Sequence, residues 1–318
     1  MQVTECCQTE QESSLTLFSQ ARFLRAIAQA IGDSCRVIEL RSEKSRSNVF
    51  AVETISSLGR RSLALAPFGL YAHPAGSDDL DTTVRDIIRQ LKTYSTTAFQ
   101  WNVRFDHAAL AQALARTGLP FSRPTTHVLT LHGDYETSFA KFNSTTRNLV
   151  RRVHREGIVV RSTLHDDDVK AYYEVHTKLA LEKGYSRALY PKAMFDELVK
   201  LDRDVVFVVA EIQNKIAAGA WFFRDGDTFL YWHAAMDRKY SRYFPSYAIV
   251  DYAIRMAHEE GRGAFNFGGS IGIASLEQFK AKWGAKQQCC WCFDWQNPLW
   301  QMVQKVRNVW SLRRIHAG

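Results

Sequence analysis

The order of strands and helices expected over residues 205–295 constrains the fold more than any other feature of the sequence. Three runs rich in β-branched and aromatic residues come first, and the turns between them indicate antiparallel hairpins: VVFVVAEI, IAAGAWFFR and TFLYWHAAM. A helix then begins at Pro245 and ends near Gly261, followed by a strand, a short helix and a final strand. This β-β-β-α-β-α-β order predicts an α/β domain with a mixed, mainly antiparallel sheet flanked by helices.

The first half of the chain also alternates helices and strands. Apolar residues recur at helical spacing in 15–31, 78–94 and 107–117, and strand patterns lie between these segments. A length of 318 residues fits two domains. We therefore expect these divisions: a flexible tail at 1–14, a first domain at 15–134, a second domain at 135–296 and a basic C-terminal helix at 297–318.

The composition indicates a globular protein that does not cross a membrane. Hydrophobic residues make up 46% and charged residues 23% of the chain, which are ordinary values. The N-terminus lacks the basic and apolar regions of a signal peptide, and no apolar run is long enough to span a bilayer, so we expect a cytoplasmic location. The six cysteines lack the spacing of a zinc site, so we expect reduced thiols and no bound metal.

The net charge favours polyanionic partners. Lysine and arginine number 41 against 33 acidic residues, a formal charge of +8, which suits nucleic acid, anionic lipid or phosphate-bearing substrates. A helix expected from about Tyr135 to Glu156 carries Arg147, Arg151 and Arg155 at a spacing of four on its outer face. This face is either a solvated surface or a surface for phosphates.

Two stretches carry a family resemblance, residues 129–161 and 229–285. The first holds a Leu–x–Gly–Asp–Tyr–Glu run before the basic helix. The second holds a Tyr–x–His strand, a strand ending in Phe265–Gly269, and the run Phe279–Lys280–x–x–Trp283–Gly284. Together they resemble the Fem family of the GCN5-related N-acetyltransferase superfamily, whose members add amino acids to the peptidoglycan precursor from aminoacyl-tRNA. The resemblance is clear over about residues 125–295.

This resemblance implies a fold and a set of roles. It implies tandem acetyltransferase-like domains, a sheet that splays beside the helix after its third strand to accept an acyl group, and a C-terminal segment that packs back on the first domain. It implies that Lys280 stabilises the tetrahedral intermediate and that Phe279 shapes the pocket. The residues it assigns to binding the acceptor are Lys183, Tyr185 and Arg187, and, in the first domain, Tyr71.

The sequence departs from the family at two points. Asn266 stands where the family usually has aspartate, which removes a charge. The glycine-rich loop with which coenzyme A users hold pyrophosphate is absent from residues 237–245, so backbone amides cannot approach a pyrophosphate as closely. Three basic side chains remain at this helix N-terminus as candidate phosphate ligands: Arg238, Lys239 and Arg242. This favours a donor other than coenzyme A.

Acyl transfer to an amine requires a proton acceptor and a stabilised oxyanion. Tyr231 and His233 alternate on one expected strand, so we expect both on the same face, with Trp232 on the other. They would contact the acceptor or relay a proton; a packed pair is the alternative. Gly268, Gly269 and Ser270 form a turn where the backbone could approach substrate, or simply a tight turn.

The leading hypothesis is an acyl- or aminoacyltransferase that forms an amide bond on an amine acceptor. The donor would be aminoacyl-tRNA, the acceptor a phosphate-bearing, peptidoglycan-type precursor of the cell envelope, and no cofactor would be bound permanently. One alternative is an acyl-coenzyme A-dependent N-acyltransferase acting on an amino sugar or amino acid. Another is a non-catalytic nucleic-acid-binding module. The basic C-terminal helix adds peripheral contact with an anionic membrane as an alternative to packing on the first domain.

Overall fold

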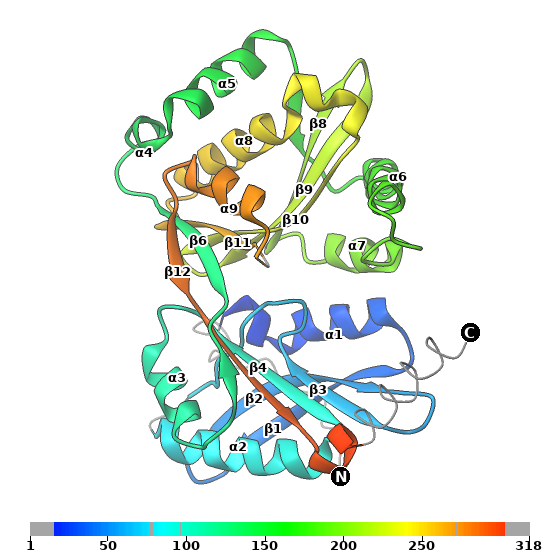
Figure 1. Ribbon diagram of the computed structural model, residues 1–318, viewed down its shortest axis with the longest axis vertical. Coiled ribbons are helices and arrows are strands. Elements are labelled where there is room, and N and C mark those ends of the chain that lie inside the picture. Colours follow the sequence, from blue (N-terminus) through cyan, green and yellow to red (C-terminus); the bar gives the residue numbers. More distant parts are fainter. Residues whose placement is uncertain (1–15, 77–78, 96, 271, 303–318) are drawn as a thin grey trace, which may run out of the picture. The chain divides into compact units, whose positions relative to one another are not determined.

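The structure is a computed structural model, and it describes residues 16–76, 79–95, 97–270 and 272–302. The chain forms two compact units, each with its own sheet (Figure 1). Unit 1 consists of the residues up to Arg123 together with those from Cys290 onward, and unit 2 consists of Pro124–Cys289.

Unit 1 contains a six-stranded sheet in the order β1-β2-β3-β4-β13-β5. Its strands are β1 (Cys35–Ser42), β2 (Ser47–Ile55), β3 (Arg61–Leu65), β4 (Ala98–Val103), β5 (Phe121–Ser122) and β13 (Trp291–Gln296). Its helices are η2 (Leu17–Ser19), α1 (Ala21–Ile31), α2 (Leu80–Tyr94) and α3 (Ala108–Ala115). All neighbouring strands are antiparallel except β3 and β4, which run parallel.

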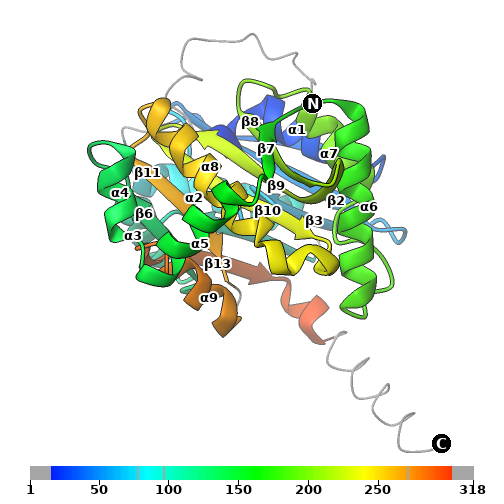
Figure 2. The same cartoon turned by 90° about the horizontal axis from the view of Figure 1, so that it is seen from above.

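Unit 2 contains a seven-stranded sheet in the order β12-β6-β11-β10-β9-β8-β7. Its strands are β6 (Thr125–Thr130), β7 (Val159–Ser162), β8 (Val205–Ile212), β9 (Lys215–Asp225), β10 (Thr228–Met236), β11 (Ala264–Gly269) and β12 (Lys286–Cys289). Its helices are α4 (Tyr135–Lys141), α5 (Ser144–Arg155), α6 (Asp166–Glu182), α7 (Lys192–Val199), η3 (Arg238–Tyr243), α8 (Pro245–Glu259) and α9 (Ala274–Ala281). Helices α4, α5 and α8 cover one face of the sheet, and α6 and α7 cover the other (Figure 2).

The mixed α/β fold class and the strand–helix order of the second domain are confirmed. Strands β8, β9 and β10, helix α8, strand β11, helix α9 and strand β12 follow in the expected sequence. The only parallel pair of described strands in this sheet is β10 with β11, because α8 crosses over the sheet between them.

The domain limits differ from the expected ones for two reasons. The strand at 125–130, expected in the first domain, pairs with β11 and β12 in the second sheet. The expected last strand is interrupted at Cys290, so that β12 belongs to unit 2 and β13 inserts between β4 and β5 of unit 1. Residues 1–14 and 303–318 lie outside the described residues.

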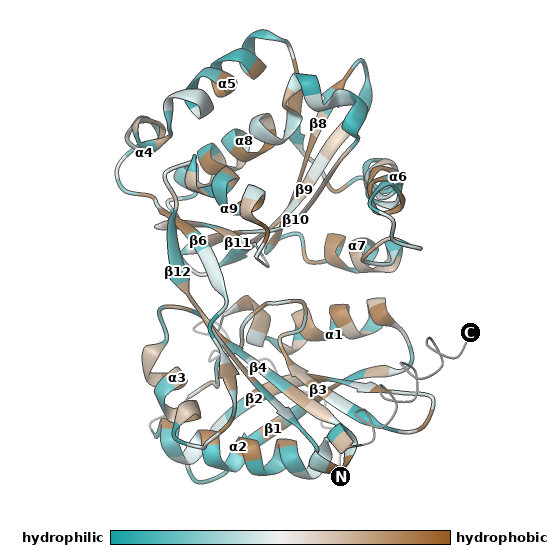
Figure 3. Ribbon diagram, in the orientation of Figure 1, coloured by the Kyte–Doolittle hydropathy of each residue, from teal (hydrophilic) through white to brown (hydrophobic). Residues whose placement is uncertain are grey.

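The helix expected over 135–156 is two helices. It is interrupted at Phe142 and Asn143, and the Asn143 side chain accepts a hydrogen bond from the Thr146 amide to cap α5. The interruption turns Phe142 into the core, where its ring packs on Trp283. Hydrophilic residues predominate along α5, as its colouring shows (Figure 3).

The core of unit 2 on the α8 face fixes how the sheet opens. Phe222, Phe229 and Phe265 are fully buried there, and Ile254 of α8 packs against the same cluster. Each such side chain contributes about 1.5–3 kcal/mol on burial. This packing lies beside the first residues of β10 and β11 and so clamps the two strands together at that end only.

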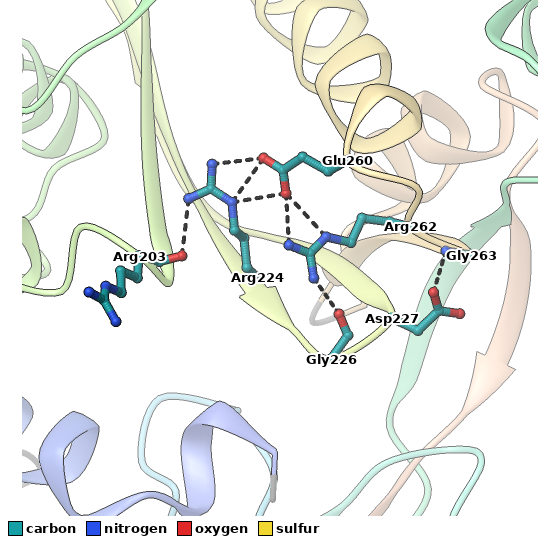
Figure 4. A network of polar contacts seen from close by, with 7 residues as sticks. All are labelled: Arg203, Arg224, Gly226, Asp227, Glu260, Arg262 and Gly263. Atoms are coloured by element: carbon teal, nitrogen blue, oxygen red, sulfur yellow. Dashed lines mark hydrogen bonds and ion pairs between the residues drawn. The ribbon is translucent and has the colours of Figure 1, made fainter. Parts of the chain in front are cut away.

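An ion network ties the β9–β10 hairpin to the end of α8 (Figure 4). The Arg224 guanidinium donates to both carboxylate oxygens of Glu260, and Arg262 donates to the same carboxylate at 2.8 Å and to the Gly226 carbonyl. Burial alone would raise the pKa of Glu260, but the hydrogen bonds from both arginines outweigh it and lower this pKa. The network therefore stabilises the fold through an ionised carboxylate.

We predict that Glu260→Gln lowers the free energy of unfolding by about 1–3 kcal/mol, since hydrogen bonds to a charged group are lost. Glu259→Gln, at the exposed neighbouring position, is the matched control and should change it by less than about 0.5 kcal/mol. Because the folded-state pKa is lowered from 4.5, the stabilisation is present above pH 4.5 and is lost as the pH falls through the folded-state value. Urea unfolding of both variants at pH 7 and pH 4 measures this; equal effects of the two substitutions at pH 7 would contradict it.

Candidate active site

The parallel strands β10 and β11 pair over a short length and then separate. Their register joins Thr228–Leu230 to Ala264–Asn266, although β10 continues to Met236 and β11 to Gly269. Beyond the paired residues, each strand bonds only to its antiparallel neighbour, β9 or β6. Backbone groups past the end of strand pairing need other partners. At the end of β11 the Gly268 amide donates to the Asn266 side chain, and the Gly268 and Gly269 carbonyls accept from Lys280.

A β-bulge in β10 occurs at the same place. Tyr231 pairs with Phe222 of β9 and His233 pairs with the adjacent Trp221, so Trp232 is the extra residue. Because neighbouring residues of β9 face opposite sides, Tyr231 and His233 also face opposite sides. The expectation that they share a face is therefore wrong, and the extra residue in the bulge is the reason.

Tyr231 lies on the α8 face and belongs to an aromatic wall. Its ring stacks on Phe222 at 5.0 Å and lies near Phe267 of β11. Tyr247, in the first turn of α8, contacts Phe279 at 5.3 Å between ring centroids. Phe279 is half-buried, as suits a residue that shapes an apolar pocket.

Lys280 is buried on the same face at the end of β11. Only 5% of it is exposed, and its Nζ donates hydrogen bonds of 2.7 Å to both the Gly268 and Gly269 carbonyls. Burial lowers the pKa of this amine to about 8, against the opposing charge of Glu277. Lys280 is thus a pre-oriented amine, still mostly protonated at pH 7, and not a solvated surface lysine.

The Asn266 side chain stabilises the turn at the end of β11. The Asn266 side-chain oxygen accepts from the Gly268 amide at 2.9 Å and from the Thr126 hydroxyl at 2.6 Å. Gly268 has φ +71°, and a Cβ there would lie 2.9 Å from the Tyr231 carbonyl. Ser270 is 2% exposed, and its hydroxyl has no hydrogen-bond partner among the described residues. The predicted turn therefore brings its polar groups next to the Lys280 amine.

His233 lies on the opposite face, where α6 and α7 pack. Its Nε2 is 3.2 Å from Nδ1 of His176, whose own Nε2 accepts from the Tyr190 amide. His176 therefore carries its proton on Nδ1 and donates it to His233. Burial first, and neighbouring positive charge second, lower the pKa of His176 to about 4 and that of His233 to about 3. Both rings are neutral at pH 7 and are weak proton acceptors.

The loop between α6 and α7 passes beside the bulge. Tyr190 packs on Trp232 at 4.8 Å, and the charge of Lys183 contributes to the lowered pKa of both histidines. The expected acceptor ligands of this loop, Lys183, Tyr185 and Arg187, are exposed, and their side chains have no hydrogen-bond or ion-pair partner among the described residues. Lys280 thus lies on one face of the sheet, and this loop contacts β10 on the other face through Tyr190.

The turn before α8 offers few backbone amides to a ligand. Asp237 accepts from the Lys239 amide at 3.1 Å and from the Lys178 amine at 2.9 Å. The amides of Tyr240, Phe244, Tyr247 and Ala248 donate to backbone carbonyls within the turn, and Pro245 has no N–H. The side chains of Arg238, Lys239 and Arg242 are exposed. Arg238 lies 3.6 Å from the Glu182 carboxylate, and Lys239 lies 3.3 Å from that of Asp237.

The predicted basic residues of α5 differ in their availability. The Arg147 guanidinium donates to the Ala140 and Phe142 carbonyls and so closes the end of α4, whereas Arg151 is exposed over the Phe139 ring. Arg152, which the sequence did not single out as a site residue, lies 3.5 Å from the Arg242 carbonyl and over the Phe244 ring. This contact joins α5 to η3 in one surface. We call it the α5–η3 basic surface: Arg151, Arg152, Arg155, Arg238, Lys239 and Arg242.

Tyr71 lies in unit 1 and is buried, with the Arg104 guanidinium over its ring. The segment around it bonds to β4: the Trp101 indole donates to the Ala72 carbonyl, and the Asn102 amide donates to the Leu70 carbonyl. The chain thus fills the space beside the parallel pair β3–β4 of unit 1. Within unit 1, Tyr71 is therefore a buried packing residue of the segment that bonds to β4.

The sequence did not predict several residues that lie at the site. His127 of β6 is buried near Lys280, and His176 and Tyr190 surround His233. His127 was missed because its strand was expected in the other domain. Among the described residues no three or more histidine, cysteine, aspartate or glutamate side chains gather as metal ligands, and no helix is long and apolar enough to cross a bilayer.

Comparisons with known proteins agree with this geometry. Residues 140–281 match the model of the acetyltransferase (GNAT) domain family. FemX has a similar structure, with a TM-score of 0.66 at 13% identity, covering 90% of this chain and 94% of that chain. The C-terminal domain of a putative lysylphosphatidylglycerol synthetase from Agrobacterium fabrum gives 0.61 at 14% identity, covering 92% and 97%. L-PGS from Bacillus licheniformis gives 0.58 at 12% identity, covering 93% of each chain. No curated protein matches the sequence.

We predict that Gly268→Ala lowers the free energy of unfolding more than Gly272→Ala does. Both glycines have φ +71°, so both substitutions add about 1–2 kcal/mol of backbone strain. Only the methyl group at 268 also meets a backbone atom, the Tyr231 carbonyl, whereas nothing lies within 4 Å at 272. Chemical unfolding of the two variants measures the difference, and equal destabilisation would show that β10 and β11 do not approach each other at Gly268.

Proposed function

We propose that this protein, whose residues 140–281 form a GNAT acetyltransferase domain within a Fem-like tandem fold, is an acyltransferase that takes an aminoacyl group from aminoacyl-tRNA. The acceptor is an amine on a phosphate-bearing precursor of the cell envelope, and the product is an amide. The observation that carries the choice of donor is the turn before α8, whose backbone amides are used internally while its basic side chains point outward.

The electrostatics of this turn favour a nucleic-acid donor over coenzyme A. A compact pyrophosphate needs several convergent backbone amides, and the amides of this turn donate to the Asp237 carboxylate and to backbone carbonyls instead. The α5–η3 basic surface instead extends over two elements and suits a series of phosphates along an RNA backbone. The similarity to FemX, to the C-terminal domain of a putative lysylphosphatidylglycerol synthetase and to L-PGS supports aminoacyl transfer as the reaction class.

The two faces of the splayed strands supply the remaining parts of the reaction. The aminoacyl ester enters from the α8 face, where Lys280 meets its carbonyl beside Gly268 and Gly269. The acceptor approaches from the other face, where Lys183 and Arg187 bind its phosphates and Tyr185 lies alongside. His233 and His176, both neutral, position the loop through Tyr190 and do not act as the base.

The first prediction for this function concerns the donor. Labelled aminoacyl-tRNA should transfer its amino acid to a UDP-linked muropeptide, and Lys280→Ala should lower the rate by about 10²- to 10³-fold because an oxyanion donor is lost. Labelled acetyl-coenzyme A, tested in parallel, should give no product. Transfer from acetyl-coenzyme A alone would overturn the donor assignment in favour of a coenzyme A-dependent N-acyltransferase, and RNA binding without transfer from either donor would favour a binding module.

A second prediction concerns the α5–η3 basic surface. The triple variant Arg151→Gln, Arg152→Gln, Arg242→Gln should raise the KM for aminoacyl-tRNA and leave kcat unchanged, since these side chains bind donor phosphates before and after the reaction equally. The slope of log KM against log salt concentration should fall by about 0.7–0.9 for each phosphate contact removed.

The matched control for this variant removes three exposed arginines of unit 1 instead: Arg25→Gln, Arg85→Gln and Arg89→Gln. It changes the net charge of the protein by the same amount. It therefore separates direct contacts with donor phosphates from long-range attraction of the tRNA to a basic protein. Equal effects of the two triple variants on KM would contradict a donor site on α5 and η3.

A further inference from the structure

His127 lies in β6, whose neighbours in the sheet are β11 and β12. In the register of these strands Thr126 pairs with Gly269 and His127 pairs with Gln287. The imidazole is 5% exposed. Its Nδ1 is enclosed and has no hydrogen-bond partner among the described residues, whereas Nε2, also without a partner there, is not among the enclosed atoms. One ring nitrogen is therefore enclosed, and the other retains some exposure.

The enclosure of Nδ1 decides where the proton lies. An N–H with no acceptor in an enclosed position costs about 1–3 kcal/mol, so the proton resides on Nε2. Burial first, and the charge of Lys280 second, lower the pKa of His127, while Glu277 opposes them weakly. At neutral pH, His127 thus presents a neutral Nε2–H donor.

Lys280 presents one further donor at the same place. An ammonium group has three N–H bonds, and two of them are held by the Gly268 and Gly269 carbonyls. The third is not used by any described residue. The Ser270 hydroxyl, also buried, follows directly in the chain. Lys280 thus holds a donor at the turn that ends β11, and His127 follows Thr126, which pairs with Gly269 of the same turn.

We propose that the His127 Nε2–H and the third Lys280 N–H together form the oxyanion site, so that His127 is a catalytic residue that binds the acyl carbonyl oxygen. This inference rests on the proposed aminoacyl transfer. When the acceptor amine attacks, the C–N bond forms and the carbonyl electron pair moves to the oxygen, which both donors then hold. Collapse of this intermediate breaks the ester C–O bond, and the amine proton passes to the departing ribose oxygen.

Three substitutions separate this role from a packing role. The glutamine amide nitrogen reaches about the position of Nε2, and the asparagine amide nitrogen reaches about that of Nδ1. We expect His127→Ala and His127→Asn to lower kcat by about 10²- to 10³-fold with little change in KM, and His127→Gln to restore activity to within about tenfold of the wild type. Urea unfolding of each variant separates loss of activity from loss of folding. Equal activity of the asparagine and glutamine variants, when both are folded, would overturn the proposal, as would a folded alanine variant within threefold of wild type.

A measurement independent of turnover keeps the two proposals distinguishable. Nitrogen-15 NMR of histidine-labelled wild-type protein at pH 7 should show His127 neutral and protonated on Nε2, with the signal assigned by its absence from His127→Gln. A proton on Nδ1 would overturn the oxyanion role whether or not the enzyme is active. The protein could instead show the expected tautomer and transfer an acetyl group from acetyl-coenzyme A but no aminoacyl group from tRNA. That result would overturn the tRNA donor and support His127 as the oxyanion donor.

Discussion

The site depends on the loss of pairing between β10 and β11 after Leu230. Strands in a sheet normally satisfy their backbone groups on both sides, and an interruption inside a sheet leaves donors and acceptors unpaired. Three features sustain the interruption here: an aromatic core that clamps the paired end, a bulge that redirects β10 at Trp232, and Lys280, whose amine bonds the carbonyls at the end of β11. The lysine thus has a structural task that orients it for any chemical one.

Both units contain a parallel pair of strands, but the chain that follows the first strand of the pair takes a different path in each. Each has a parallel pair of strands separated by a crossover helix, β3–β4 with α2 in unit 1 and β10–β11 with α8 in unit 2. In unit 1 the chain after β3 returns and bonds to β4 through Trp101 and Asn102, so the space is filled. In unit 2 the chain after β10 leaves to form η3, and among the described residues no strand pairing joins β10 to β11 beyond Leu230 and Asn266. The physical difference between them is where the connecting segment goes, not which elements precede it.

The sequence was sufficient for the order of elements because each strand and helix of unit 2 has a clear period and a clear terminator, such as Pro245 before α8 and Gly261 after it. It drew attention to Lys280 and the glycine turn because these belong to a recognisable run of residues, and their roles stay predictions. It could not reveal the bulge, since strict alternation is the default for a strand and no residue type marks the insertion at Trp232. Nor could it place β6, because a lone strand of five or six residues carries no information about which sheet it will join, and the histidine on it went unnoticed for that reason.

The insertion of β13 between β4 and β5 bears on the order in which the protein is made. Unit 1 is discontinuous in sequence: its sheet needs a strand that follows the whole of unit 2. During synthesis from the N-terminus, β4 and β5 therefore emerge with a gap between them, and every residue of unit 2 leaves the ribosome before that gap can be filled. Unit 2 can complete its own sheet first, as soon as Cys289 is free, and unit 1 closes last. The domain with the open pair of strands is thus finished while its neighbour still exposes an unpaired strand edge.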